Sequence, residues 1–176
     1  AVREHLPQAT VLRPSIVFGR EDQFINRFAR MIVGSPVPIV PVLRRKAKFQ
    51  PVFVGDLARA IALSLTDAAV HGGKTYAIGG PEVITMGDLI RWIIAQTGRK
   101  VAVAEIAYPF GAMISAMGFL PGAPITWDQW RMLGVDNVVP ADDPGITAFG
   151  ISPVPLDVVA PPWLVQYRQQ GRFASR

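Results

Sequence analysis

Thr10-Val-Leu-Arg-Pro-Ser-Ile-Val-Phe-Gly19 and Gln50-Pro-Val-Phe-Val-Gly-Asp-Leu-Ala-Arg-Ala-Ile61 are the two stretches that decide the fold of this chain. Each begins as an apolar run of the kind that forms buried strands: Val11 and Leu12 predict one strand, and residues 52–54 predict another. Open α/β sheets place ligand contacts at the carboxyl ends of their strands. The residues that follow these two runs are therefore the first candidates for a site.

Residues with special backbone properties follow both runs. Pro14 has no N–H and is predicted to end ladder donation from the first strand. Gly55 is predicted as a turn, and Asp56 as the N-cap of a helix over 56–67. Arg13 and Asp56 form either a buried ion pair that joins the strand ends, or an exposed arginine and an ordinary cap. The apolar face predicted for this helix consists of Leu57, Ala60, Ile61 and Leu65.

The composition of the chain limits the classes of protein to which it can belong. The chain has 176 residues, half of them hydrophobic, which is enough for a sizeable core. It has no cysteine and two histidines that are not spaced as ligands, so we expect neither disulfides nor a metal site. The net charge is +5, with the densest basic run at residues 44–48. These charges are not interleaved with aromatic residues, so nucleic-acid binding is set aside.

Strand and helix patterns alternate over residues 9–106, which predicts an α/β architecture. Thr85-Met-Gly-Asp88 and Thr126-Trp-Asp-Gln129 are predicted capping boxes that open helices. Beyond Pro140 we expect an extended tail with one short helix near 163–169. The other predicted elements are a helix from Asp22 to Val33, an extended edge segment at 37–43, and strands at 74–78 and 101–106.

The segment from Ile106 to Trp127 carries no charge. Pro109 and Pro121 limit its helix, predicted over 108–120, to about thirteen residues, whereas a membrane span needs about 20. A helix that is apolar nearly all round is either buried in the core or forms a docking surface for a protein partner or a membrane. Both readings stay open.

We expect three parts along the chain. Residues 1–66 are predicted to end a Rossmann-like domain, with an edge loop at 34–49. Residues 67–140 are predicted to form a small, mainly helical lobe that faces substrate or partner, and residues 141–176 the proline-rich tail. Residues 1–6 have the pattern of a helix already under way, so the chain is expected to begin inside a larger protein.

Several motifs, in order, carry a family resemblance. They are residues 9–19, 50–60 and 76–81, with a narrower match at 21–29, 125–129 and 136–139. Over about residues 1–140 the chain resembles the carboxyl-terminal half of an extended or atypical short-chain dehydrogenase/reductase, the NAD-dependent epimerase/dehydratase family. Within that family it is most similar to the NAD(P)H-binding accessory subunit of respiratory complex I and its bacterial relatives.

Two hallmarks of that family are absent from this sequence. No Gly-x-x-Gly-x-x-Gly loop occurs, and Tyr76, Tyr108 and Tyr167 have no lysine four residues on. The first element binds the pyrophosphate, and the second shuttles a proton. We expect both upstream of Ala1, so no catalytic residue is assigned here and the fragment alone is expected to be inactive.

The resemblance implies positions for binding residues. Pro14, Ser15 and Ile16 would pass under the nicotinamide of NADP or NAD, provided that the missing half is present; otherwise Pro14 simply ends a strand. Phe18 and Gln50 lie where relatives face substrate, although core packing is the favoured reading for Phe18. Arg44 and Arg45 would face phosphates or a partner, unless the basic run is a solvated loop.

The resemblance also implies a role. The favoured hypothesis is an accessory, structural or assembly component that holds its dinucleotide tightly. It would dock through residues 106–139 on a respiratory-complex subunit or on a membrane surface. The alternative is an NAD(P)-dependent epimerase, dehydratase or reductase for a nucleotide sugar or related small molecule. The implied location is the cytoplasm, at the periphery of the inner membrane, or the matrix side in a eukaryote.

Overall fold

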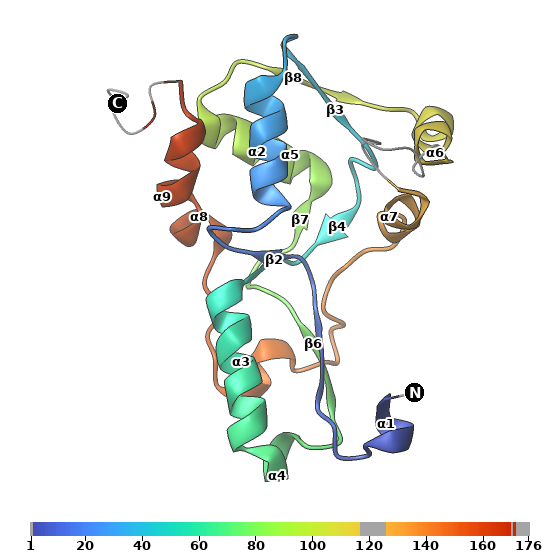
Figure 1. Ribbon diagram of the computed structural model, residues 1–176, viewed down its shortest axis with the longest axis vertical. Helices are drawn as coiled ribbons and strands as arrows, with labels where there is room; N and C mark the ends of the chain where they lie inside the picture. Colours follow the sequence, from blue (N-terminus) through green and yellow to red (C-terminus); the bar gives the residue numbers. More distant parts are fainter. Residues whose placement is uncertain (1, 117–125, 170, 172–176) are drawn as a thin grey trace. The chain divides into compact units, whose positions relative to one another are not determined.

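The computed structural model describes residues 2–116, 126–169 and 171. The chain forms two compact units (Figure 1). Unit 1 consists of residues 1–22, 50–83 and 138–161, and unit 2 of residues 23–49, 84–137 and 162–176. Each unit therefore combines segments that lie far apart in the sequence.

Unit 1 contains two pairs of parallel strands. Strand β1 (Val11–Pro14) pairs with β6 (Thr75–Ile78), and β2 (Val17–Phe18) pairs with β5 (Val52–Phe53). Parallel pairs joined through helical connections are typical of α/β sheets, so the predicted fold class is confirmed. The helical elements of this unit are α1 (Val2–His5), α3 (Val54–Thr66), α4 (Ala68–His71), η1 (Gly145–Phe149) and α8 (Leu156–Val159), and α9 (Pro161–Leu164) begins at its last residue.

The core of unit 1 lies between α3, β6 and η1. It is formed by Val52, Ala60, Tyr76, Ile78, Ile146, Phe149 and Ile151. His71 is buried beside it, with Nδ1 2.9 Å from the Tyr76 hydroxyl and its ring stacked on Phe149 at 4.3 Å. This hydrogen bond satisfies the phenol and one ring nitrogen, which lowers the cost of burying two polar side chains.

The orientation of α3 differs from the prediction. The helix begins at Val54, and Asp56 is not its cap; instead the Asp56 carboxylate accepts a hydrogen bond from the Val154 N–H at 2.8 Å. The buried positions are Asp56, Ala60 and Ser64, whereas Ile61 and Leu65 are exposed. A pattern based on hydrophobicity alone misses this face because two of its members are polar. Ser64 donates to the Ile61 carbonyl within the helix, whereas Asp56 is satisfied by the distant Val154 N–H.

The ion pair between Arg13 and Asp56, one of the two alternatives predicted for these residues, does not form. Both residues belong to the described part of unit 1, where Asp56 is buried and Arg13 is exposed on β1. Because the Asp56 carboxylate is satisfied by a backbone N–H, its burial does not require a positive partner.

Unit 2 contains a parallel strand pair, β3 (Ile39–Val42) with β8 (Ala102–Glu105). It also contains an antiparallel pair, β4 (Lys48–Phe49) with β7 (Ile84–Thr85). The predicted edge segment at 37–43 is thus a strand with one paired side, which tolerates Pro41. Helices α2 (Ile25–Gly34) and α5 (Met86–Thr97) pack together, and their buried side chains include Ile32, Leu89 and Ile93. The other helical elements here are α6 (Tyr108–Ala116), α7 (Trp127–Met132) and η2 (Val165–Tyr167).

The starts of two helices show where the capping residues predicted from local sequence agree with the structure and where they do not. Thr85 caps α5 as predicted, since its hydroxyl accepts the Asp88 N–H at 3.1 Å, and Gly98 ends the helix with a φ of 66°. Asp22 does not cap α2, which begins at Ile25; its carboxylate instead accepts the Gly19 N–H within a turn. The end of the predicted helix over 108–120 lies outside the described residues.

The segment after Pro140 differs from the extended tail that was predicted. It contains η1, α8, α9 and η2, and its apolar residues Ile146, Phe149, Ile151 and Leu164 are buried. Proline suppresses long helices but permits short helical turns, which is why helical periodicity fades here although the segment packs.

Substituting Thr85 tests the cap of α5. The Thr85 hydroxyl first and the Arg91 guanidinium second hold the pKa of Asp88 below its ordinary value. Thr85→Ala should lower the free energy of unfolding by about 1 kcal/mol at neutral pH. Because a lowered carboxyl pKa contributes stability above the unfolded pKa and loses it as pH falls through the folded pKa, the deficit should shrink in acid.

Urea unfolding at several pH values measures this difference. Thr66→Ala is the matched control, since that hydroxyl bonds only to the Leu63 carbonyl near the end of α3, and its effect should stay within about 0.5 kcal/mol. Equal destabilisation by the two variants would show that the Thr85 cap has no special role.

Candidate functional site

The carboxyl end of β1 lies in unit 1 and forms the candidate cofactor edge. Its ladder with β6 continues past Pro14, because the Ser15 N–H donates to the Ile78 carbonyl at 2.8 Å. The prediction that Pro14 ends ladder donation is therefore wrong. N–H groups alternate between the two sides of a strand, so position 14 faces away from β6, where a missing N–H costs no bond to that strand.

The two outer edges of this strand pair differ. On β6, the Ala77 N–H donates to the Asp143 carboxylate at 2.9 Å, and the same carboxylate accepts the Gly145 N–H through its other oxygen. On β1, no strand of the described chain pairs with the side opposite β6. The Leu12 N–H points to that side by the same alternation. The β1–β6 pair thus has one covered edge and one edge that is open within the described residues.

Gln50 ties the strand ends together. Its N–H donates to the Ser15 hydroxyl at 3.2 Å, and its side-chain amide donates to the Gly80 carbonyl at 2.8 Å. The amide oxygen accepts the Val139 N–H at 2.9 Å, and the Gln50 carbonyl accepts the Gly80 N–H at 3.2 Å. One residue therefore connects the ends of β1 and β6 to the segment at 139.

Two glycines make this arrangement possible. A Cβ on Gly80 would lie 1.9 Å from the Pro51 carbonyl oxygen, and a Cβ on Gly79 would lie 2.8 Å from the Gln50 amide carbon. Both contacts are inside van der Waals separation. The contact at Gly80 is with backbone, so that position requires glycine, whereas a side chain at position 79 would displace the side chains of Gln50 and Val139.

The predicted cofactor residues lie together at this edge but differ in exposure. Pro14 is exposed, Ile16 is half-buried, and Ser15 is buried with its hydroxyl bonded to Gln50. The Ile16 carbonyl accepts the Val52 N–H at 2.9 Å. Their assignment to a dinucleotide stays a prediction.

Phe18 is fully buried and packs on Phe53 with ring centroids 5.8 Å apart, which is the core packing favoured for it. Gln50 was predicted to face substrate, and that assignment also stays a prediction. The sequence did not reveal that Gln50 bonds to the Ser15 hydroxyl and to backbone groups of Gly80 and Val139, since an isolated glutamine in a loop has no distinctive pattern.

A second candidate surface lies in unit 2, around Arg44. Its guanidinium lies 4.8 Å from the Tyr108 ring centroid and 4.4 Å from that of Trp130. Arg44 has a φ of 50°, an uncommon conformation for a residue other than glycine. Cation–π contacts at these distances are stabilising and help to hold this strained turn. The sequence predicted a basic loop but gave no sign of its aromatic partners.

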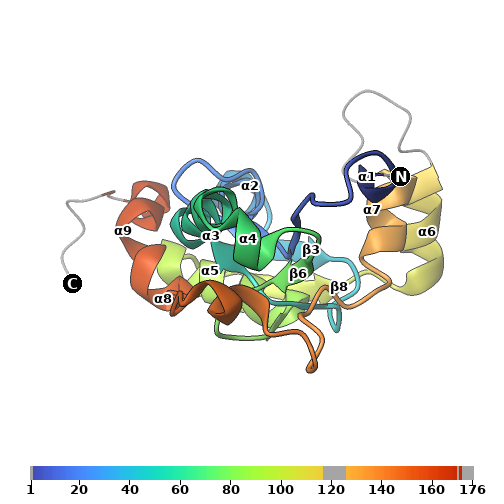
Figure 2. The same ribbon diagram turned by 90° about the horizontal axis from the view of Figure 1, so that it is seen from below.

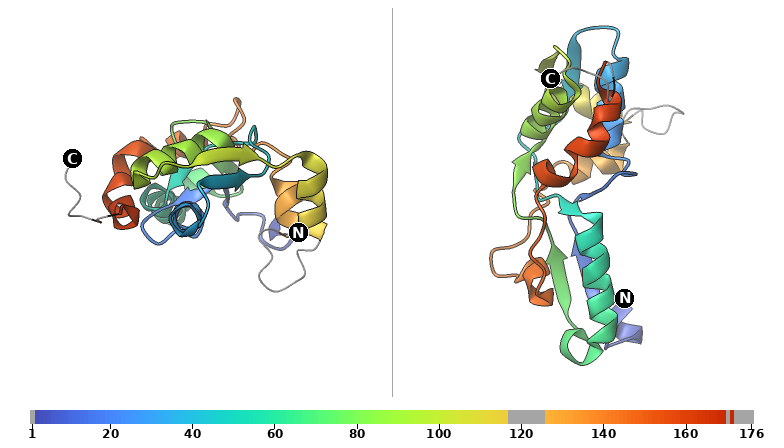
Figure 3. Two further views of the ribbon diagram at one scale, coloured as in Figure 1. Left: turned by 90° about the horizontal axis from the view of Figure 1, so that it is seen from above. Right: turned by 90° about the vertical axis from the view of Figure 1, so that its left-hand side faces the viewer.

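Helices α6 and α7 lie side by side next to this loop (Figures 2 and 3). Their close approach depends on Gly111, where a Cβ would lie 2.6 Å from the Trp130 ring. Arg45, also predicted to face phosphate or partner, is exposed, and its carbonyl accepts the Gly87 N–H at 3.0 Å. The exposed apolar side chains of this region are Tyr108, Phe110, Met113, Trp127, Met132 and Val135.

We call these six side chains together with Arg44 and Arg45 the aromatic–basic surface. Its α6 is less buried than a core helix, which favours the docking reading of the uncharged segment over complete burial. No helix within the described residues is both long and apolar enough to cross a membrane. Within the same residues, no three potential metal ligands cluster.

Gln50→Ala tests the connection between the strand ends. The variant leaves the Gly80 carbonyl and the Val139 N–H without their side-chain partner, and should lower the free energy of unfolding by about 1–3 kcal/mol. Urea unfolding measures the loss, with the exposed Gln166→Ala as control. An equal, small effect of both variants would contradict the role assigned to Gln50.

Comparison with known proteins places this geometry in a family. The chain is 33% identical over 163 residues to the mitochondrial NADH dehydrogenase [ubiquinone] 1 alpha subcomplex subunit 9 of Mus musculus, which covers 89% of this chain and 42% of the relative. It is 32% identical to the Arabidopsis thaliana protein of the same name, over 97% of this chain and 45% of the relative. The chain thus spans somewhat under half the length of these relatives. No protein-family model matches it.

Solved structures show the same fold. The gox2253 crystal structure matches 93% of this chain and half of its own, with a TM-score of 0.59 and 23% identity. A nucleoside-diphosphate-sugar epimerase from Staphylococcus aureus matches 82% of this chain and 49% of its own, with a TM-score of 0.58 and 11% identity. The dTDP-glucose 4,6-dehydratase DesIV from Streptomyces venezuelae, solved with NAD bound, matches 90% of this chain and 43% of its own. Its TM-score is 0.57 and its sequence identity is 18%.

The predicted resemblance is confirmed by both comparisons. Over most of its length the chain is a homologue of the alpha subcomplex subunit 9 proteins of mitochondrial NADH dehydrogenase, with the Rossmann-like fold of the short-chain dehydrogenase/reductase-type epimerases and dehydratases.

Proposed function

We propose that this chain acts as part of an accessory subunit of a respiratory NADH dehydrogenase, complex I, rather than as an enzyme with its own turnover. The observation that carries this proposal is the 33% identity to the mouse subunit along 89% of the chain. The Arabidopsis relative extends the similarity to almost the whole chain. The expected location is the cytoplasmic or matrix face of the membrane that holds the complex.

The first part of the proposal concerns the cofactor. NAD or NADP would bind in the whole protein at the carboxyl end of β1, with Pro14, Ser15 and Ile16 beneath the nicotinamide, mainly through backbone atoms. Three features support this position: the end of a parallel strand is the usual ligand edge, the Gln50 network fixes it, and β1 has an open side for further strands. The DesIV structure provides an NAD-bound example of the fold.

The second part concerns docking. The aromatic–basic surface would bind a protein subunit of the complex. Aromatic residues, methionine and arginine are the types enriched in protein interfaces, and all three occur together here. A membrane surface is the competing occupant, and the same side chains allow it.

Cofactor retention tests the first part. The whole gene product, purified without added nucleotide and then denatured, should release close to one equivalent of NAD or NADP, measured by absorbance and mass. Residues 1–176 alone should release none, because the pyrophosphate loop is not in this sequence. Retention by this fragment would mean that the binding site is misplaced. Rapid turnover of the bound cofactor with a nucleotide sugar would favour the enzyme alternative.

Met113→Asp tests the second part. Met113 is 57% exposed on α6, so a charge there should leave folding intact but weaken docking by at least about tenfold. The measurement is co-purification of complex I subunits with the tagged gene product. Val158→Asp, an equally exposed apolar residue on α8, is the control.

Two outcomes would contradict the docking proposal. One is unchanged co-purification of the Met113→Asp variant. The other is binding of the parent protein to vesicles of anionic lipid, without any protein subunit, that the same variant abolishes. The second outcome would assign the surface to the membrane.

A further inference from the structure

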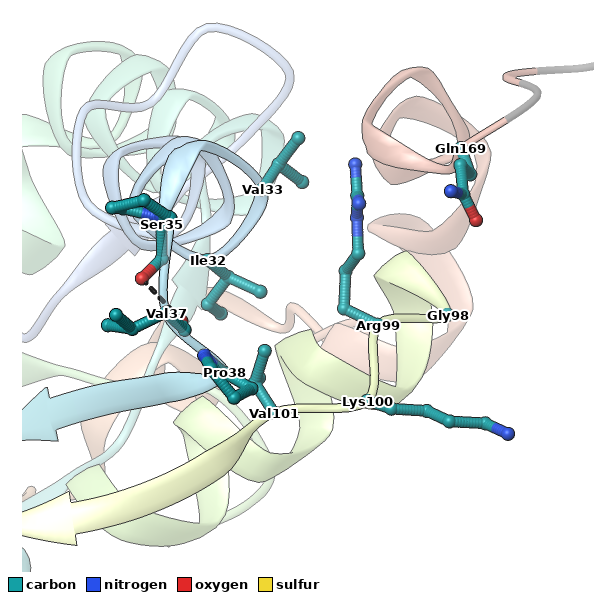
Figure 4. A pocket seen from close by; sticks show the side chains of 11 residues that line it. Ile32, Val33, Ser35, Val37, Pro38, Gly98, Arg99, Lys100, Val101 and Gln169 are labelled. Atoms are coloured by element: carbon teal, nitrogen blue, oxygen red, sulfur yellow. Dashed lines mark hydrogen bonds between the residues drawn. The ribbon is translucent and has the colours of Figure 1, made fainter.

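An open pocket of about 420 Å³ lies in unit 2, between the end of α2, the start of β3 and the turn between α5 and β8. Figure 4 shows it from close by. It is separate from the Gln50 network, which belongs to unit 1, and none of the aromatic–basic surface lines it. Its volume lies within the usual range for small-molecule sites, about 300–1,000 Å³.

Aliphatic side chains form part of the pocket wall. Ile32 and Val33 come from α2, Val37 and Pro38 from the segment before and at the start of β3, and Val101 from the approach to β8. The Ser35 hydroxyl is occupied, since it donates to the Val37 carbonyl at 2.7 Å. The lining combines these aliphatic side chains with polar and charged ones, so it can contact both the hydrocarbon and the charged part of a ligand.

One side chain gives this pocket a chemical preference. Arg99 extends between α2 and Gln169, whereas Lys100 points away from them (Figure 4). The Arg99 Nε is shielded from solvent and has no hydrogen-bond partner among the described residues. The residues that line the pocket include two cations and no carboxylate. Shielded donors of this kind normally have a partner, and an acceptor on a bound ligand would supply one here.

The end of α5 does not supply that acceptor. Arg99 follows Gly98, the C-terminal cap of the helix, where a positive charge is favourable beside the helix dipole. However, the Gln96 carbonyl at this end accepts from the Arg168 Nε at 2.9 Å, and the Ala95 carbonyl accepts the Gly98 N–H. A dipole interaction stabilises the charge but leaves the Nε–H unbonded.

We propose that this pocket binds a small organic anion, a carboxylate or phosphate group joined to an aliphatic body, with Arg99 as its anchor. Guanidinium presents a planar fork of donors that fits either oxyanion, and the valine and isoleucine walls fit the hydrocarbon. This site is additional to the proposed dinucleotide and docking functions and does not depend on them.

Titration of the whole protein with octanoate and with octyl phosphate, followed by calorimetry and by backbone amide shifts, tests the proposal. At least one of the two should bind, with shifts confined to residues 32–38 and 98–101. Octanol lacks the charge and acetate lacks the aliphatic body, so both should bind at least about tenfold more weakly. Which of the two anions binds more tightly identifies the headgroup.

Arg99→Gln should weaken binding by about tenfold or more, while Lys100→Gln, which removes a lining cation whose side chain points away from Arg99, should weaken it much less. Circular dichroism checks that both variants fold, and the amide shifts of the parent protein locate the site without any variant. Absence of binding by both anions, equal binding of octanol, shifts elsewhere, or equal loss in both variants would overturn the proposal.

Discussion

The candidate cofactor edge depends on the hydrogen bonds made by the side-chain amide of Gln50. It has a donor and an acceptor in one planar group, and it uses both to hold the Gly80 carbonyl and the Val139 N–H while its own backbone reaches Ser15. Loops at strand ends have backbone groups without ladder partners, and burying those groups unpaired would be costly. A single glutamine meets that requirement, and the glycines at 79 and 80 permit the close approach that it needs.

The two edges of the β1–β6 pair differ, and this difference relates the Gln50 network to function. Asp143 occupies the outer side of β6, which protects that edge from further pairing. The outer side of β1 has no such cover among the described residues. The same unit also exposes two large apolar side chains of α3, Ile61 and Leu65. A covered edge beside an uncovered one is the arrangement expected where a parallel sheet continues on one side only. Relatives more than twice as long as this chain are consistent with that arrangement.

Local chemistry made part of this structure predictable. Thr85 and Asp88 form the expected capping box, Gly98 ends the same helix, and the apolar runs at 11–14 and 75–78 are strands. The motifs that carried the family resemblance needed no tertiary information. Features that depend on a distant partner were missed: Asp56 satisfied by Val154, Arg44 between two aromatic rings, and the packed short helices after Pro140. Pro14 was misjudged because its effect depends on which side of the strand it faces, and sequence alone does not define that side.

The central proposal is that β1 is an inner strand of a larger sheet whose second neighbour is not among the described residues. Amide hydrogen exchange at Leu12 tests it most directly, because this N–H faces the side opposite β6. The account predicts fast exchange in residues 1–176 alone and slow exchange in the whole gene product, with Val11 protected in both. Equally fast exchange at Leu12 in the two proteins would contradict it.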